Sequence, residues 1–151
     1  MTQRDMSDRQ GVGLAIRAFH ELDQDDVVSL WHDCDLVKPW NDPVKDICRK
    51  LGVQRELFLV GTSGGKLVAT VMAGFDGHRG WINYLAVACD YRRRGYGRLL
   101  MGEATRRLKA IGCPKINLQI RRTNLDVVSF YESLGYIEDD VISMGRRLVQ
   151  D

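Results

Sequence analysis

The stretch "LAVACDYRRRGYGRLL", Leu85 to Leu100, decides what fold this chain is expected to adopt. An apolar run typical of a strand ends near Val87, three arginines follow, and Gly95 and Gly97 come directly before an amphipathic helix. Glycines let the loop turn tightly and present several backbone N–H groups at the positive end of that helix. We therefore expect the loop to bind an anion, most naturally a pyrophosphate. The charges that would surround it are Arg92, Arg93, Arg94 and Arg98.

Other interpretations of glycine-rich stretches in this chain are weaker. The glycines could simply end a turn, with the arginines as a solvated face, but the order strand, RxxGxG, helix narrows that choice. A dinucleotide-binding fingerprint needs a third glycine where this chain has Leu100. The stretch "GTSGGKL", residues 61–67, is one residue short of a Walker loop and joins two β runs, so it predicts a hairpin.

Length and composition are those of one globular domain. The chain has 151 residues, 44% hydrophobic and 28% charged, with a formal net charge of +2. This balance argues against a chain-wide attraction to nucleic acid or to a membrane surface. The sequence contains no apolar run long enough to span a bilayer, and "MTQRDMSDRQ" lacks the apolar core of a secretory signal, so we expect a cytoplasmic protein.

The cysteines predict neither a disulfide framework nor a metal site. They are widely spaced and form no CxxC pair, which fits free thiols in a reducing compartment and no bound metal. These residues are Cys34, Cys48, Cys89 and Cys113.

The hydrophobic pattern divides the chain into a leader, residues 1–12, and one domain, residues 13–151. Strands are expected at 14–19, 56–61, 66–75, 81–87, 115–120 and 136–148, and helices at 23–36, 43–52, about 96–111 and 124–135. Three consecutive β runs form an antiparallel meander, whereas the later strand, helix, strand order requires a parallel crossover. The fold class is therefore α/β with a mixed α+β sheet.

Two motifs together resemble the GNAT superfamily of N-acetyltransferases. "LAVACDYRRRGYGRLL" matches the superfamily's RxxGxG acetyl-CoA motif, and "NLDVVSFYESLGY", residues 124–136, resembles its next motif, in which an asparagine opens a helix and a tyrosine lies seven residues further on. The resemblance runs from about Leu14 to Leu148. "PWNDP", "FDGHRG" and "GCPKINLQI" are similar to the bacterial YpeA-type subgroup.

The resemblance implies a central mixed sheet of six to seven strands flanked by about four helices. It implies that the fourth and fifth strands splay apart and that the pantetheine arm of acetyl-CoA lies in the gap like an added strand. The residues it assigns to acetyl-CoA are Leu85, Ala86, Val87, Arg92, Arg93, Arg94, Gly95, Tyr96, Gly97, Arg98 and Asn124.

The same resemblance makes Tyr131 the general acid. A phenol with a pKa near ~10 can protonate a thiolate whose conjugate acid has a pKa near ~8.5 as coenzyme A leaves. By spacing alone Tyr131 shares a helical face with Val127 and Leu134, which is typical of a core aromatic residue. Asn124 is also expected to cap its helix.

The base that would deprotonate the acceptor amine is not evident. Many relatives carry a glutamate on the fourth or fifth strand, but "WINYLAV" and "KINLQI" contain no carboxylate. His78 and Asp76 in the turn "FDGHRG" are weak alternatives, and Cys89 is better interpreted as a small buried residue than as an acetyl carrier. Trp40 is expected either to form a wall of the acceptor site or to anchor its loop.

The leading hypothesis is an acetyl-CoA-dependent N-acetyltransferase that transfers acetyl directly to a primary amine. The acceptor would be a small molecule or a protein amino terminus. A non-catalytic module that binds or senses acyl-CoA is the second hypothesis, and a nucleic-acid binder using "RRRGYGR" is a third, disfavoured by the low net charge. Both a monomer and a homodimer fit the sequence.

Overall fold

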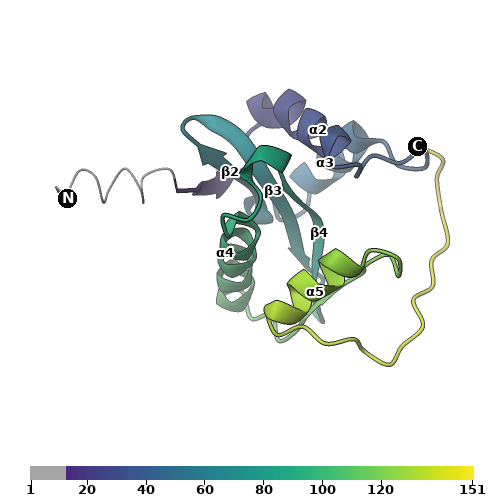
Figure 1. Ribbon diagram of the computed structural model, residues 1–151. Coiled ribbons are helices and arrows are strands. Elements are labelled where there is room, and N and C mark those ends of the chain that lie inside the picture. Colours follow the sequence, from purple (N-terminus) through teal and green to yellow (C-terminus); the bar gives the residue numbers. More distant parts are fainter. Residues whose placement is uncertain (1–12) are drawn as a thin grey trace, which may run out of the picture.

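The computed structural model describes residues 13–151, and the predicted leader, residues 1–12, lies outside them. The described part contains four α-helices and a five-stranded sheet (Figure 1). The strands are β1 (Ala15–Ala18), β2 (Phe58–Ser63), β3 (Lys66–Phe75), β4 (Gly80–Val87) and β5 (Ile116–Leu118). The helices are α2 (Gln24–Asp33), α3 (Pro43–Leu51), α4 (Tyr96–Ala110) and α5 (Leu125–Ser133). Short 3₁₀ turns lie at Glu21–Asp23, Arg55–Leu57 and Cys89–Tyr91.

The sheet is mixed, as predicted. Its strands lie in the order β1-β2-β3-β4-β5, with every neighbouring pair antiparallel except β4 and β5, which run parallel. The β2–β3 hairpin turns at Gly64 and Gly65, whose φ angles of 57° and 79° suit a tight hairpin turn. This confirms the hairpin predicted from "TSGG".

Helices cover both faces of the sheet (Figure 1). On one face, α4 packs Leu100 and Leu108 against apolar side chains of the sheet that include Leu59. On the other face, Trp31 of α2 and Ile47 of α3 pack in a second cluster around Phe58, Val60 and Met72. Because Leu59 and its neighbours Phe58 and Val60 face opposite clusters, β2 follows the two-residue period of a strand buried on both sides.

The parallel pairing of β4 with β5 is short. It runs from Gly80 opposite Ile116 to Ile82 opposite Leu118 and then stops, so the rest of β4 has no strand beside it on that edge. The splaying implied by the resemblance is therefore present. It leaves an open strand edge along the second half of β4.

A bulge in β4 begins where this pairing ends. The register with β3 shifts between Asn83, opposite Met72, and Ala86, opposite Thr70. Within the bulge Tyr84 has a φ of 52°, a left-handed conformation that is uncommon for a bulky residue. As a result Ile82 contacts the core under α4, whereas Tyr84 packs in the cluster under α2 and α3.

The prediction of a closing strand at 136–148, and with it a sheet of six to seven strands, is wrong for this structure. The described residues form five strands, and residues 137–150 have no regular secondary structure (Figure 1, yellow). Only three residues of β5 pair with β4, so β5 offers a very short edge to a further strand. Side-chain contacts hold the segment instead: Lys115–Asp139, Gln119–Ser143, Asn41–Arg147 and Arg49–Asp151.

Candidate functional site

A cavity of about 980 Å³ opens where β4 and β5 separate. Four parts of the chain line it: β4 around its bulge, the segment that follows β5, the inner face of α5, and α3 with the loop before it. The cavity therefore brings together residues that lie far apart in the sequence. Of the predicted site residues it contains Leu85, Asn124, Tyr131 and Trp40.

One end of the cavity is bounded by the open edge of β4. The carbonyl oxygen of Val87 accepts hydrogen bonds from Arg92 Nε at 3.1 Å and Cys34 Sγ at 3.6 Å. Leu85 lines the cavity, whereas the Ala86 side chain is buried on the α2–α3 side. A backbone edge with no neighbouring strand suits a ligand that binds by main-chain hydrogen bonds, as an extended amide arm does.

The arginine and glycine loop joins this edge to α4. Arg93 and Gly95 have φ angles of 63° and 79°, which turn the chain sharply before the helix begins at Tyr96. The first N–H groups of a helix have no partner inside the helix, and no described side chain caps α4 at Gly95. The start of α4 therefore has the geometry of an anion site.

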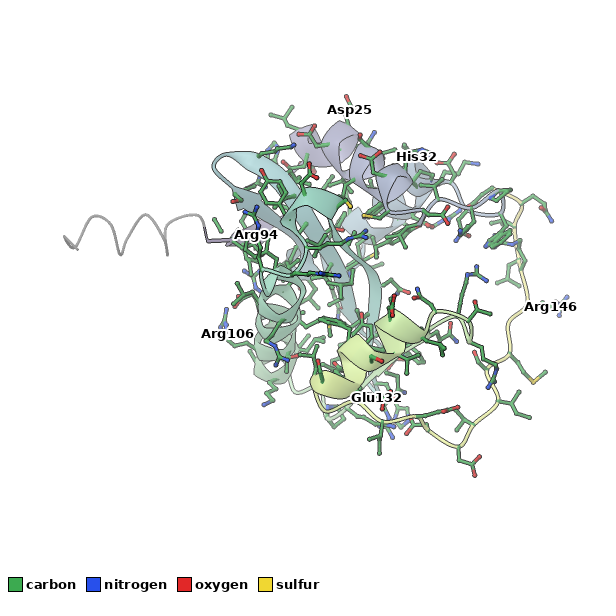
Figure 2. All side chains as sticks on the ribbon, in the orientation of Figure 1. Asp25, His32, Arg94, Arg106, Glu132 and Arg146 are labelled. Atoms are coloured by element: carbon green, nitrogen blue, oxygen red, sulfur yellow. The ribbon has the colours of Figure 1, made fainter. Side chains whose placement is uncertain are left out.

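The arginines of the loop take different positions. The guanidinium of Arg94 lies 4.9 Å from the centre of the Tyr91 ring, and Arg98 donates to Ser133 Oγ on α5 at 3.4 Å. Figure 2 shows Arg94 at the start of α4, far from Arg106 further along the same helix. None of the four predicted arginines forms an ion pair within residues 13–151, so their charges remain available to a phosphate.

The structure gives a packing reason for the residue type at Tyr96 and at Gly97, and the sequence showed neither. The Tyr96 side chain is buried, and its hydroxyl lies 3.5 Å from Ser63 Oγ, so any contact with a ligand would come from its backbone. At Gly97 an added Cβ would lie 3.2 Å from the Phe130 ring of α5. Gly97 therefore allows two helices to approach closely, and the turn geometry predicted for both glycines applies to Gly95.

Tyr131 lies on α5 with its ring buried and its hydroxyl accessible. The residue is 6% exposed and packs edge-on against Phe130 and Tyr136. No hydrogen bond is made by its hydroxyl, and no fully buried side-chain oxygen of the described residues lacks a partner, so the hydroxyl reaches open space. Burial raises the pKa of Tyr131 above its ordinary value, which keeps the phenol protonated. The two interpretations of Tyr131, core aromatic and proton donor, are compatible.

The predicted side-chain cap at Asn124 is not formed. Asn124 is the first flanking residue of α5, but its side chain accepts no hydrogen bond from the first turn. Its ψ of 71° differs from the extended 116° of Asp42, which does cap α3 by accepting from Val44 and Lys45. Asn124 instead lines the cavity.

The other end of the cavity is built mostly by side chains that no motif indicated, with Trp40 as the exception. Tyr84 donates from Oη to Asp46 Oδ2 at 2.5 Å, and its ring stacks on Trp31 at 3.8 Å. The bulge that aims Tyr84 is fixed by Thr70, whose hydroxyl donates to the Tyr84 carbonyl and accepts from Trp31 Nε1, both at 2.9 Å. Trp40 lines the same end, with the guanidinium of Arg121 5.4 Å from the centre of its ring.

The alternatives considered for the base lie outside the cavity. Asp76 Oδ1 accepts from the backbone of His78 and Arg79, and these hydrogen bonds lower the pKa of Asp76. His78 is exposed and lines neither this cavity nor the neighbouring one beside β5. Cys89, which was not a candidate base, is also exposed, so its interpretation as a small buried residue is wrong. The carboxylates that do line the cavity, Asp35 and Asp46, are both ion paired.

Within residues 13–151 no three histidine, cysteine or carboxylate side chains gather as metal ligands, and all four cysteines are free. None of the described helices is both long and apolar enough to cross a membrane.

The chain is similar to known acetyltransferases in sequence. A family model described as "Acetyltransferase (GNAT) family" matches residues 16–136. A protein of Yersinia pestis named "Acetyltransferase" is 46% identical over 138 residues, which is 91% of this chain and 98% of the relative. An acetyltransferase of Sodalis glossinidius is 47% identical over 139 residues, with the same coverage.

Solved structures share the fold at low identity. A protein of Bacillus halodurans described as a transcriptional regulator has a TM-score of 0.71 and 20% identity, and covers 90% of this chain and 100% of its own. An aminoglycoside antibiotic 6'-N-acetyltransferase of Acinetobacter haemolyticus has a TM-score of 0.69 and 17% identity, covering 89% and 99%. At these identities the likeness extends to the fold alone.

Proposed function

The chain belongs to the acetyltransferase (GNAT) family, and from this premise we propose that it transfers acetyl from acetyl-CoA directly to a primary amine. The family supports the reaction class and the donor. The acceptor, a small molecule or a protein amino terminus, and the roles of single residues are part of the proposal. Acetyl-CoA, the proposed donor, supplies an activated thioester.

One observation carries the proposal: the open edge of β4 at Leu85 and Tyr131 of α5 line one cavity, and the uncapped start of α4 packs against α5 at Phe130, the residue before Tyr131. The open edge can hold an extended pantetheine arm and the start of α4 a pyrophosphate. Leu85, Ala86 and Val87 would provide the main-chain contacts, and the loop from Arg92 to Arg98 the phosphate contacts. Asn124 would contact the arm from the side of α5.

The chain's own side chains then have distinct tasks. Burial raises the pKa of Tyr131, so the phenol is protonated at neutral pH, and we assign it the hydrogen bond and the proton that the leaving sulfur accepts. Because Asp35 and Asp46 are both ion paired, we assign no side-chain base, and the acceptor ammonium would lose its proton to water.

The test combines binding and turnover in the wild type and in Tyr131→Phe. Acetyl-CoA should bind both proteins with affinities within about threefold, because the hydroxyl is a small part of the contact surface. Amine-dependent release of coenzyme A should fall by about 10²-fold or more in the variant, since general acid catalysis contributes ~10²–10⁴-fold. Tyr136→Phe, which removes the hydroxyl of the neighbouring ring, is the matched control.

Two results would contradict the proposal. If acetyl-CoA does not bind the wild type saturably, the donor assignment is wrong. If acetyl-CoA binds but no amine increases the release of coenzyme A, the alternative of a non-catalytic acyl-CoA sensor is favoured. An unchanged rate in Tyr131→Phe removes Tyr131 from the mechanism.

A further inference from the structure

The charged side chains that line the cavity do not balance. The acidic residues are Asp35 and Asp46, and the basic ones are Lys38, Arg49, Lys50 and Arg121. Lys38 pairs with Asp35 at 3.2 Å, and Arg49 pairs with Asp46 at 3.0 Å and with Asp151, which lies outside the lining, at 2.6 Å. The two cations that remain, Lys50 and Arg121, have no carboxylate within ion-pair distance in residues 13–151.

Lys50 is the more unusual of the two because it is buried. It is 9% exposed, and its ammonium donates to the carbonyl of Ala73 at 2.5 Å. An ammonium has three N–H donors, so this single hydrogen bond leaves it incompletely satisfied. Burial lowers the pKa of Lys50, and the charge of Glu56 opposes that shift without forming an ion pair. Burying a cation without a counter-ion costs free energy of folding unless a bound ligand supplies the opposite charge.

Arg121 stands at the rim of the same cavity, on the segment that follows β5. It is exposed, and its guanidinium lies over the Trp40 ring at 5.4 Å. Stacking fixes the plane of a guanidinium while leaving its edge free to donate hydrogen bonds. The cavity thus carries a buried cation on α3 and an oriented one on the segment after β5.

We propose that the acceptor is an amine that also carries an anionic group, a carboxylate or a phosphate, which binds to Lys50 with help from Arg121. This inference rests on the proposed acetyltransferase function and narrows its substrate class. The ion-paired Asp35 and Asp46 cannot compete for Lys50 without giving up Lys38 and Arg49. The positive charge of the lining also disfavours an acceptor with a second cation near Lys50.

The test uses amines matched in length, with release of coenzyme A as the readout at saturating acetyl-CoA. The pairs are 4-aminobutyrate with butylamine and 2-aminoethyl phosphate with ethanolamine, which separate a carboxylate from a phosphate. We expect kcat/KM to favour the anionic member of at least one pair by roughly 10- to 100-fold, the range for a hydrogen bond to a charged group. Lys50→Met should reduce this preference to within about threefold, Lys50→Arg should retain much of it, and Arg121→Gln should reduce it less.

A second measurement needs no variant. Butyrate should inhibit the acetylation of butylamine by the wild type competitively, and butyramide, which has the same size without the charge, should inhibit at least about tenfold more weakly. A third measurement needs no turnover: calorimetric titration of butyrate into the wild type and into Lys50→Arg and Lys50→Met checks binding directly. Acetyl-CoA affinity should be the same in all three proteins.

The outcomes separate the two proposals. If neutral amines are used as well as or better than their anionic partners, the inference is wrong and the proposed function stands. If no amine is used at all, the proposed function is contradicted, and the inference about Lys50 then depends on the titration. Loss of butyrate binding in Lys50→Met would support the inference, and equal binding in Lys50→Met and the wild type would overturn it. Equal inhibition by butyrate and butyramide also overturns it.

Discussion

Backbone groups form most of one end of the cavity, and side chains form most of the other. The end that we propose holds the donor consists mainly of backbone: the open edge of β4, followed along the chain by the first turn of α4, which packs against α5. The acceptor end consists of side chains from α3, the loop before it, the β4 bulge and the segment after β5. Backbone geometry suits a donor that is the same throughout a family, whereas side chains can be exchanged singly. The comparison teaches that one fold can keep its donor while its acceptor changes.

The largest expected effect comes from breaking the support of the acceptor end with Thr70→Val. The Thr70 hydroxyl links the Trp31 indole to the carbonyl of Tyr84, and Thr70 is fully buried. Its loss leaves a buried donor and an acceptor unsatisfied, so the free energy of unfolding should fall by about 2–4 kcal/mol. Urea denaturation measures this change.

Thr105→Val is the matched control for that experiment. The Thr105 hydroxyl donates to the Met101 carbonyl within α4, where the carbonyl also belongs to the helical ladder, so the change should stay within about 0.5 kcal/mol. If the two variants are equally stable, the hydrogen bonds of Thr70 do not support the bulge.

A smaller effect is expected when the donor end is altered with Gly95→Ala. Nothing lies within 4 Å of an added Cβ there, but the φ of 79° strains any residue with a side chain by about 1–2 kcal/mol. Relief of that strain should reorient the first turn of α4, and the dissociation constant of acetyl-CoA should rise by about tenfold. Butyrate binding at the acceptor end should not change.

Gly102→Ala tests whether the effect comes from φ or from the loss of glycine. Gly102 lies inside α4 with ordinary helical φ and open space around it, so alanine there should stabilise the helix by up to about 1 kcal/mol. Equal acetyl-CoA affinity in Gly95→Ala and the wild type would mean that the left-handed turn does not position the donor.

The smallest effect concerns acid stability of the acceptor end. Arg49 lowers the pKa of Asp151 to about 2, below its ordinary value of 3.8. A depressed pKa in the folded state stabilises the protein above pH ~4, and that contribution is lost as pH falls toward 2. Asp151→Asn should therefore lose less stability than the wild type between pH 5 and 2, measured by thermal unfolding. The control is Asp140→Asn, which removes an exposed carboxylate without an ion pair and should lose as much stability as the wild type over this pH range. If Asp151→Asn also loses as much stability as the wild type, the Arg49–Asp151 pair does not contribute to acid stability.

The same contrast explains how much the sequence could predict. The antiparallel meander with its parallel crossover, the hairpin at Gly64 and Gly65, the four helices and the β4 splaying follow from local patterns and one motif. Tyr84 and Asp46 could not be found, because they are 38 residues apart and meet only through a bulge that reverses the side-chain alternation of β4. The closing strand was wrongly predicted because alternation at 136–148 says nothing about whether a partner edge exists.

The close contact between Gly97 and Phe130 has a consequence for protein engineering. Phe130 precedes Tyr131 on α5, and its ring rests on the first turn of α4. Replacing Phe130 with a smaller side chain would remove the surface that packs against the first turn of α4, where we propose that the pyrophosphate binds. Changes to α5 beside Tyr131 are therefore expected to disturb the start of α4, and libraries that vary Phe130 should vary residues 95–98 with it.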